Sequence, residues 1–74
     1  MAATISSSQE PVVILRLPAV RRITGYSTST IYRLAAEGRF PRQVALGPKS
    51  VGWVQHEVRE WVDARIAERD STER

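Results

Sequence analysis

The 74-residue chain contains no cysteine and a single histidine, His56. It therefore has no thiols for disulfide bonds or for a structural zinc site of the Cys/His kind. One histidine and no glycine-rich phosphate loop leave no plausible nucleophile–base pair, so we expect neither an enzyme nor a protein that needs a metal or cofactor. A chain without cysteine also fits a reducing compartment, and we predict the cytoplasm.

Long apolar stretches are missing as well. No run approaches the roughly 18 apolar residues of a membrane helix, and residues 1–8 have neither the basic segment nor the apolar stretch of a secretory signal. Hydrophobic residues make up 42% of the chain and charged residues 26%, which is typical of globular proteins. We predict one small soluble domain with little room for an enclosed pocket.

Acidic residues are scarce in the middle of the chain. Residues 16–49 contain seven basic residues and one acid, Glu37, whereas residues 50–74 contain four arginines and six acids. This asymmetry favours a surface in the middle segment that faces a polyanion, with an ordinary solvated surface as the alternative.

The first 25 residues predict a tail, a strand and a helix. Residues 1–11 are rich in serine and have no hydrophobic period, so we expect a disordered tail. The β-branched run 12–15 is typical of a short strand. Pro18 favours the start of a helix, and Gly25 favours its end. The apolar side of this helix carries Val20 and Ile23.

A second helix is predicted over residues 27–37. Ser27 is the expected N-cap, and Tyr26 and Ile31 have the spacing of a hydrophobic staple across it. Gly38 is suited to end the helix. Because only about two residues separate this helix from the first one, the two must cross at a large angle, as in a helix-turn-helix.

After the second helix the hydrophobic period changes from helical to alternating. Residues 44–53 alternate around the turn 47–50, which predicts a β-hairpin. The helical period returns over 55–69, and we expect residues 70–74 to fray. One face of this third helix carries Val58, Trp61, Val62 and Ile66. The predicted fold is mainly α with a small β-hairpin, a winged helix-turn-helix in the order β-α-α-β-β-α, with its DNA-binding domain over 12–69.

The outward face of the second helix is the candidate nucleic-acid surface. A helix that enters the major groove needs short side chains for close approach and an arginine that donates to guanine O6 and N7. Free amides at its N-terminus suit a phosphate. Helical spacing turns Ile31, Leu34, Ala35 and Gly38 inward. This spacing leaves five residues outward, which are Thr28, Ser29, Tyr32, Arg33 and Ala36. The polar ones are candidate contacts, together with Ser27 beside the free amides of the helix start.

The hairpin is interpreted as a wing. Lys49 and Ser50 lie in its turn, where Lys49 would meet a phosphate or the minor groove. Arg39 and Arg42 flank the base of the hairpin and would contact the adjacent DNA backbone. The structural alternatives are a solubilising charge for Lys49 and helix capping for Ser27.

Two roles are considered for the tryptophans, which are stacking on nucleic-acid bases and packing in the core. Trp53 is in phase with Val51, and Trp61 is in phase with Val58 and Val62. We therefore predict that both are core residues.

Five short motifs occur in a fixed order. They are Arg16-Leu17-Pro18, Thr24 to Ser27 (TGYS), Ser29 to Leu34 (STIYRL), Glu37 to Pro41 (EGRFP), and Val51-Gly52-Trp53. Together they resemble the AlpA family of small prophage and mobile-element regulators, within the MerR-like winged-helix DNA-binding proteins. The resemblance covers roughly residues 12–68, and the combination of the last three motifs is specific.

This resemblance implies a protein that binds double-stranded DNA as a transcriptional regulator or as an excisionase. It also implies the bacterial cytoplasm, close to the nucleoid, as the location. An excisionase bends attachment-site DNA so that a separate integrase can excise the element, and neighbouring copies can bind in tandem. The resemblance also places Ser29, Thr30, Tyr32 and Arg33 in the recognition helix and Lys49-Ser50 in the wing. Relatives often have a basic residue at the position of Thr28 and arginine at that of Lys49.

A protein-interaction module is the alternative function. The third helix carries four acids that would supply a surface for a toxin, with this chain as the antitoxin, or for an integrase, with this chain as an adaptor. These acids are Glu57, Glu60, Asp63 and Glu68.

Overall fold

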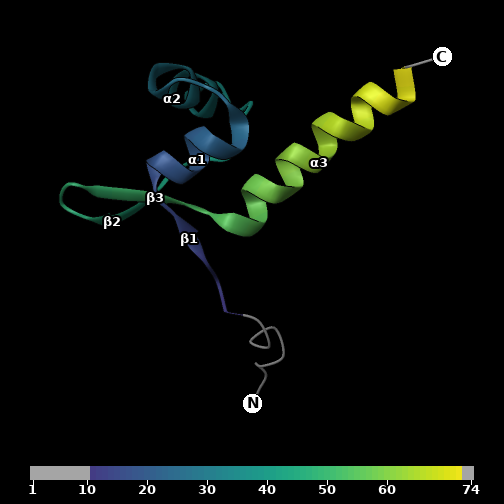
Figure 1. The fold of residues 1–74 in the computed structure, drawn as a ribbon. Helices are drawn as coiled ribbons and strands as arrows, with labels where there is room; N and C mark the ends of the chain where they lie inside the picture. Colours follow the sequence, from purple (N-terminus) through teal and green to yellow (C-terminus); the bar gives the residue numbers. More distant parts are fainter. Residues whose placement is uncertain (1–10, 73–74) are drawn as a thin grey trace.

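The computed structural model describes residues 11–72. Its elements are β1 (Ile14–Leu15), α1 (Leu17–Thr24), α2 (Thr28–Ala36), β2 (Val44–Gly47), β3 (Ser50–Val54) and α3 (Gln55–Thr72), as drawn in Figure 1. The predicted order β-α-α-β-β-α and the mainly α fold with a small hairpin are confirmed. The predicted tail lies outside the described residues except for Pro11, and α3 continues past residue 69 to Thr72.

The turn between α1 and α2 is closed by local hydrogen bonds. Gly25 adopts the left-handed conformation with φ 78°, and its N–H donates to the Arg21 carbonyl oxygen at 2.7 Å. The Thr24 hydroxyl donates to the Val20 carbonyl oxygen at 2.9 Å and accepts from the Tyr26 amide at 3.1 Å. The chain therefore reverses direction within three residues, as a helix-turn-helix requires.

Both ends of α2 are capped as their residues predict. The Ser27 hydroxyl accepts from the Thr30 amide at 3.3 Å, which confirms Ser27 as the N-cap. At the other end Gly38 has φ 77°, its amide donates to Ala35, and the Arg39 amide donates to Leu34 at 2.8 Å. This pair of bonds is a Schellman motif, which satisfies carbonyl groups that the helix leaves without partners.

A three-stranded antiparallel sheet joins the hairpin to the start of the domain. Its order is β1-β3-β2, so β3 is the central strand and Leu15 lies opposite Trp53. Gly52 is buried at this junction. A Cβ atom there would collide with the Ile14 side chain and lie 3.0 Å from the Leu15 carbonyl oxygen. Only glycine therefore lets β1 pack this closely on β3.

The core lies where α1, α2, β3 and the start of α3 meet. Its buried side chains are Val20, Ile31, Leu34, Ala35, Phe40, Trp53 and Val58. Trp53 is fully buried, as predicted. Trp61 is only half-buried and packs from the side, with its ring 5.9 Å from that of Tyr26 and 4.9 Å from that of Phe40.

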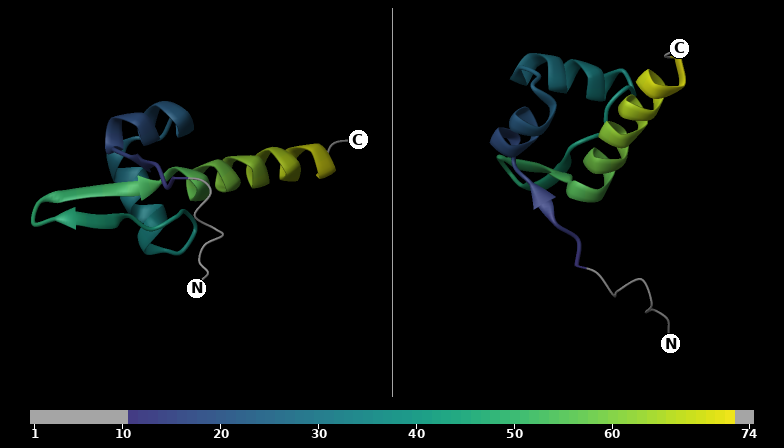
Figure 2. Two further views of the ribbon diagram at one scale, coloured as in Figure 1. Left: turned by 90° about the horizontal axis from the view of Figure 1, so that it is seen from below. Right: turned by 45° about the vertical axis from the view of Figure 1, so that its right-hand side comes forward.

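Three apolar placements differ from the sequence prediction. Gly38, expected to face inward, is exposed because it lies in the turn after α2 rather than on the helix itself. Ile23 is 48% exposed and Ile66 is 44% exposed. Ile66 keeps the helical period of the core residues, but α3 has passed the edge of the core by that point (Figure 2).

Figure 2 also shows that the β2–β3 hairpin and α3 project in opposite directions from this core. None of the helices within residues 11–72 has the length and the apolar content needed to cross a membrane.

Candidate nucleic-acid interface

Most candidate contacts of α2 lie on one side of its first two turns. Ser27, Ser29 and Arg33 are exposed, and Thr28 and Thr30 are half-buried. The structure therefore brings these five residues together as a hydroxyl-rich surface that is followed by one guanidinium group.

Some of the hydroxyl groups at the start of α2 are hydrogen-bonded to each other. The Ser27 hydroxyl donates to Thr30 Oγ1 at 3.0 Å while it accepts from the Thr30 amide, and it lies 3.4 Å from Ser29 Oγ. Capping is thus a role that Ser27 has in the folded chain. The hydroxyl of Thr28 makes no such bond to this cluster, which leaves it available beside the first amides of the helix.

Tyr32 is not fully outward as the helical spacing suggested. Its ring is half-buried and packs edge-on against Trp53, with ring centroids 5.7 Å apart and an interplanar angle of 62°. Tyr32 follows Ile31 directly, at the margin of the inward face, and the large indole of Trp53 extends to that margin. An inward face estimated from α2 alone cannot include a partner from a distant strand.

An ion-pair cluster at the end of α2 joins three side chains. Glu37 Oε2 lies 3.7 Å from Arg33 Nη1, and Glu37 Oε1 accepts from Arg39 Nη1 at 3.3 Å. The side chains of Arg33 and Arg39 remain 58% and 68% exposed. We call these residues the Glu37 cluster. This cluster was not predicted from the sequence, although the four-residue spacing between Arg33 and Glu37 is a recognisable signal.

The loop from α2 to β2 is held by both tryptophans. The indole N–H of Trp61 donates to the Arg39 carbonyl oxygen at 2.8 Å, and that of Trp53 donates to the Pro41 carbonyl oxygen at 3.1 Å. Arg42 follows directly and is exposed. The backbone that carries two of the predicted DNA-contacting arginines is therefore fixed to β3 and α3.

The hairpin places the remaining candidates away from the helices. Gly47 pairs with Ser50, which leaves Pro48 and Lys49 as the two turn residues. Lys49 is exposed and Ser50 is half-buried. All of β2 is exposed, so the hairpin extends past the core as a wing does (Figure 1).

An open cleft of about 930 Å³ lies between α2, the loop that follows it and α3. Its lining includes Arg33, Arg39 and Arg65. The Arg65 guanidinium lies 5.3 Å from the centre of the Trp61 ring and its Nε is 3.2 Å from Glu68 Oε1. Arg65 is not among the predicted site residues, because nothing in the helical period of α3 shows that this turn faces α2.

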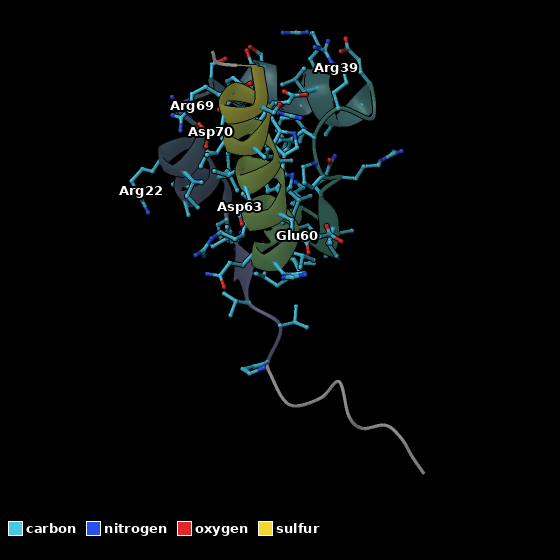
Figure 3. The ribbon with its side chains drawn as sticks, turned by 90° about the vertical axis from the view of Figure 1, so that its right-hand side faces the viewer. Arg22, Arg39, Glu60, Asp63, Arg69 and Asp70 are labelled. Carbon is cyan, nitrogen blue, oxygen red and sulfur yellow. The ribbon has the colours of Figure 1, made fainter. Side chains whose placement is uncertain are left out.

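The acidic and basic side chains around α3 point in several directions. In Figure 3, which views α3 from its outer side, Arg39 and Arg22 lie on opposite flanks of the helix.

The single histidine pairs with one acid. His56 Nε2 lies 3.0 Å from Glu60 Oε2. In the part of the chain that the structure describes, no three His, Asp or Glu side chains gather in a way that would hold a metal ion.

The sequence of this chain has counterparts among known proteins. Residues 13–66 match the model of the family described as Prophage CP4-57 regulatory protein (AlpA). The chain belongs to the AlpA family.

Two relatives of this AlpA-family chain show the extent of the similarity. The uncharacterized protein ORF88 of Enterobacteria phage P4 is 51% identical over 55 residues, which are 74% of this chain and 62% of that protein. The DNA-binding transcriptional activator AlpA of Escherichia coli (strain K12) is 40% identical over 65 residues, which are 80% of this chain and 93% of that protein. The chain thus spans less than two thirds of the phage protein and nearly all of the bacterial one.

Proposed function

We propose that this AlpA-family chain is a sequence-preferring double-stranded DNA-binding protein of a mobile element. Its recognition helix, residues 27–37, enters the major groove, and its wing, residues 47–50, contacts the flanking backbone or minor groove. The observation that carries the proposal is the exposed face of α2, where small hydroxyl residues precede Arg33. The printed name of the Escherichia coli relative, a DNA-binding transcriptional activator, supports the same function.

Each part of the surface has a separate role in this proposal. The first amides of α2, beside Thr28 and Ser29, bind a phosphate. The Arg33 guanidinium donates to a base edge, where a guanine offers two acceptors. Arg39, Arg42 and Lys49 bind backbone phosphates and add affinity without sequence preference.

The protein acts on gene expression, on excision of the element, or on both. A regulator needs one promoter site, whereas an excisionase needs adjacent copies on bent DNA and an integrase that performs the bond chemistry. The exposed second half of α3 is a surface on which an integrase or a neighbouring copy can bind. A count of excised element in cells with and without the gene separates the two roles.

A protein-interaction module is the second candidate, and one observation favours it. Residues 63–71 of α3 are all exposed, and this segment projects from the core (Figure 2). An antitoxin or an integrase adaptor would use such a helix. Recovery of one stoichiometric protein partner, without retention of DNA at moderate salt, would favour this candidate over the first.

Affinity selection from random-sequence duplexes, at about 150 mM salt, tests DNA binding directly. We expect enrichment of a short motif, and two copies of it about one helical turn apart would indicate adjacent molecules on one face of the DNA. Retention that disappears as the salt concentration rises, without any enriched motif, would contradict sequence preference.

A further inference from the structure

Glu37 occupies an unusual position in the basic part of the molecule. It is the one acid among residues 16–49, and its two carboxylate oxygens face Arg33 and Arg39, at 3.7 and 3.3 Å. Both arginines are in the DNA surface proposed above. A negative charge at this place repels phosphates, so affinity for DNA in general does not explain it.

Stability of the fold does not explain Glu37 either. It is the C-cap of α2, where the negative end of the helix dipole disfavours an acid. The carbonyl groups at this helix end are already bonded by the amides of Gly38 and Arg39. Exposed ion pairs such as those of the Glu37 cluster contribute little to the free energy of unfolding. An acid that stands at the negative end of a helix dipole, without a gain in the free energy of unfolding, points to a functional role.

The geometry of the ion pair leaves Arg33 able to recognise a base. Glu37 faces the Nη1 atom of Arg33, on the opposite side of the guanidinium from the edge formed by Nε and Nη2. That edge carries two parallel N–H groups, the arrangement that donates to guanine O6 and N7. A carboxylate on Nη1 restricts the rotation of the long side chain and thus fixes the direction of this edge.

We propose that Glu37 is a positioning residue that raises the sequence specificity of DNA binding. It orients the guanidinium of Arg33 toward the bases, and it offsets positive charge on Arg33 and Arg39 that would otherwise attract any phosphate backbone. The proposal rests on the DNA-binding function proposed above. It adds that the free protein lowers its own affinity for unrelated DNA through one carboxylate.

The test compares Glu37→Gln with Glu60→Gln in the full chain. Both variants change the net charge equally, and Glu60 has an exposed partner of its own, His56, outside the Glu37 cluster. The probes are the duplex enriched with the wild-type protein and a scrambled duplex of the same length. Affinities are measured over a series of salt concentrations, and circular dichroism checks that each variant is folded.

Glu37→Gln is expected to bind the scrambled duplex more tightly and with a salt slope steeper by up to about 0.9, the value for one additional neutralised phosphate. Its ratio of affinities for the enriched and scrambled duplexes should fall about fivefold, the lower limit for one bidentate arginine–base contact. Glu60→Gln should change neither quantity by a comparable amount. In an Arg33→Ala background, Glu37→Gln should no longer lower the ratio.

Equal behaviour of the two variants would overturn the proposal, because general charge would then account for the effect. A lowered ratio that persists in the Arg33→Ala background would also overturn the positioning role. If the wild-type chain binds neither duplex, the proposed DNA-binding function fails, and this role of Glu37 fails with it. If the wild-type protein binds the enriched duplex but Glu37→Gln leaves the ratio of the two affinities unchanged, the role of Glu37 is refuted. The proposed DNA-binding function then still stands.

Discussion

The two halves of α3 differ in how they are stabilised. The first half contributes Val58 to the core and packs Trp61 between Tyr26 and Phe40. From residue 63 onward every described side chain is exposed, and two ion pairs there, Arg65 with Glu68 and Arg69 with Asp70, join neighbours on the helix. The second half therefore depends on the first, because a helix of about 12 residues or fewer is marginal by itself in water.

The same contrast separates the proposed DNA surface from α3. The helix-turn-helix and the hairpin are tied to the core by both indole N–H groups and by Arg16, whose Nε donates to the Val51 carbonyl oxygen at 3.0 Å. A rigid frame of this kind holds contacting side chains in one arrangement. Residues 63–71 of α3 are all exposed, so changes there should affect stability and DNA binding least.

The largest effect is expected for Trp53→Ala. This change removes the largest fully buried side chain, and it should lower the free energy of unfolding by about 3–5 kcal/mol. Since a domain of this size has about 3–5 kcal/mol of net stability, the variant should be largely unfolded. Ile66→Ala, on the exposed half of α3, should cost less than about 1 kcal/mol. Urea denaturation followed by circular dichroism measures both changes. Equal losses of the free energy of unfolding would contradict the contrast between the core and the exposed half of α3.

Gly52→Ala should be next in size. The added methyl group has no space between Ile14 and Leu15, so the strands must separate at a cost of about 1–3 kcal/mol. Gly47→Ala is the matched control in the same hairpin, because its Cβ would meet nothing closer than the Ser50 Cβ at 4.0 Å. A thermal melt in which the two variants lose the same stability would show that β1 does not need this close approach.

Arg33→Ala should weaken binding to the enriched duplex by about 1–3 kcal/mol if Arg33 contacts a base. Lys49→Ala should weaken binding to all sequences similarly and reduce the salt slope by about one. Arg59→Ala, an exposed arginine on α3 outside the proposed surface, should do neither. Fluorescence anisotropy with labelled duplexes measures all three, and wild-type affinity in the first two variants would refute the assignment of contacts.

The smallest effect is expected when residues 68–74 are deleted. Residues 68–71 are all exposed, so the free energy of unfolding should change by no more than about 0.5 kcal/mol, and binding to a duplex with a single copy of the enriched motif should stay the same. A loss of several kcal/mol in urea denaturation would mean that the end of α3 contributes to the core after all.

Local sequence signals predicted the elements, because the residues that start and end helices act over a few positions. Ser27 and Gly38 marked the limits of α2, and Gly25 marked the turn before it. The hydrophobic period predicted Trp53 in the core, but it could not show where the core stops. For that reason Ile66 was assigned to the same face as the buried Val58.

The candidate site was predicted in part for the same reason. Exposure of Arg33 follows from helical spacing within α2, whereas the packing of Tyr32 on Trp53 depends on a strand about twenty residues later. The Glu37 cluster spans the turn after α2, and Arg65 reaches the cleft from another helix. Such contacts between elements depend on the angle at which helices cross, which the spacing within one helix does not determine.

Because of the two indole hydrogen bonds to the loop after α2, tryptophan fluorescence can report on the position of this loop. Trp53 and Trp61 are the two tryptophans of the chain, and their N–H groups donate to the carbonyl groups of Pro41 and Arg39. Any displacement of this loop alters the surroundings of at least one indole ring. Unlabelled protein therefore carries an intrinsic fluorescence signal at the junction of α2 and the β2–β3 hairpin. Substitution of either tryptophan by phenylalanine would assign the signal to one end of the loop.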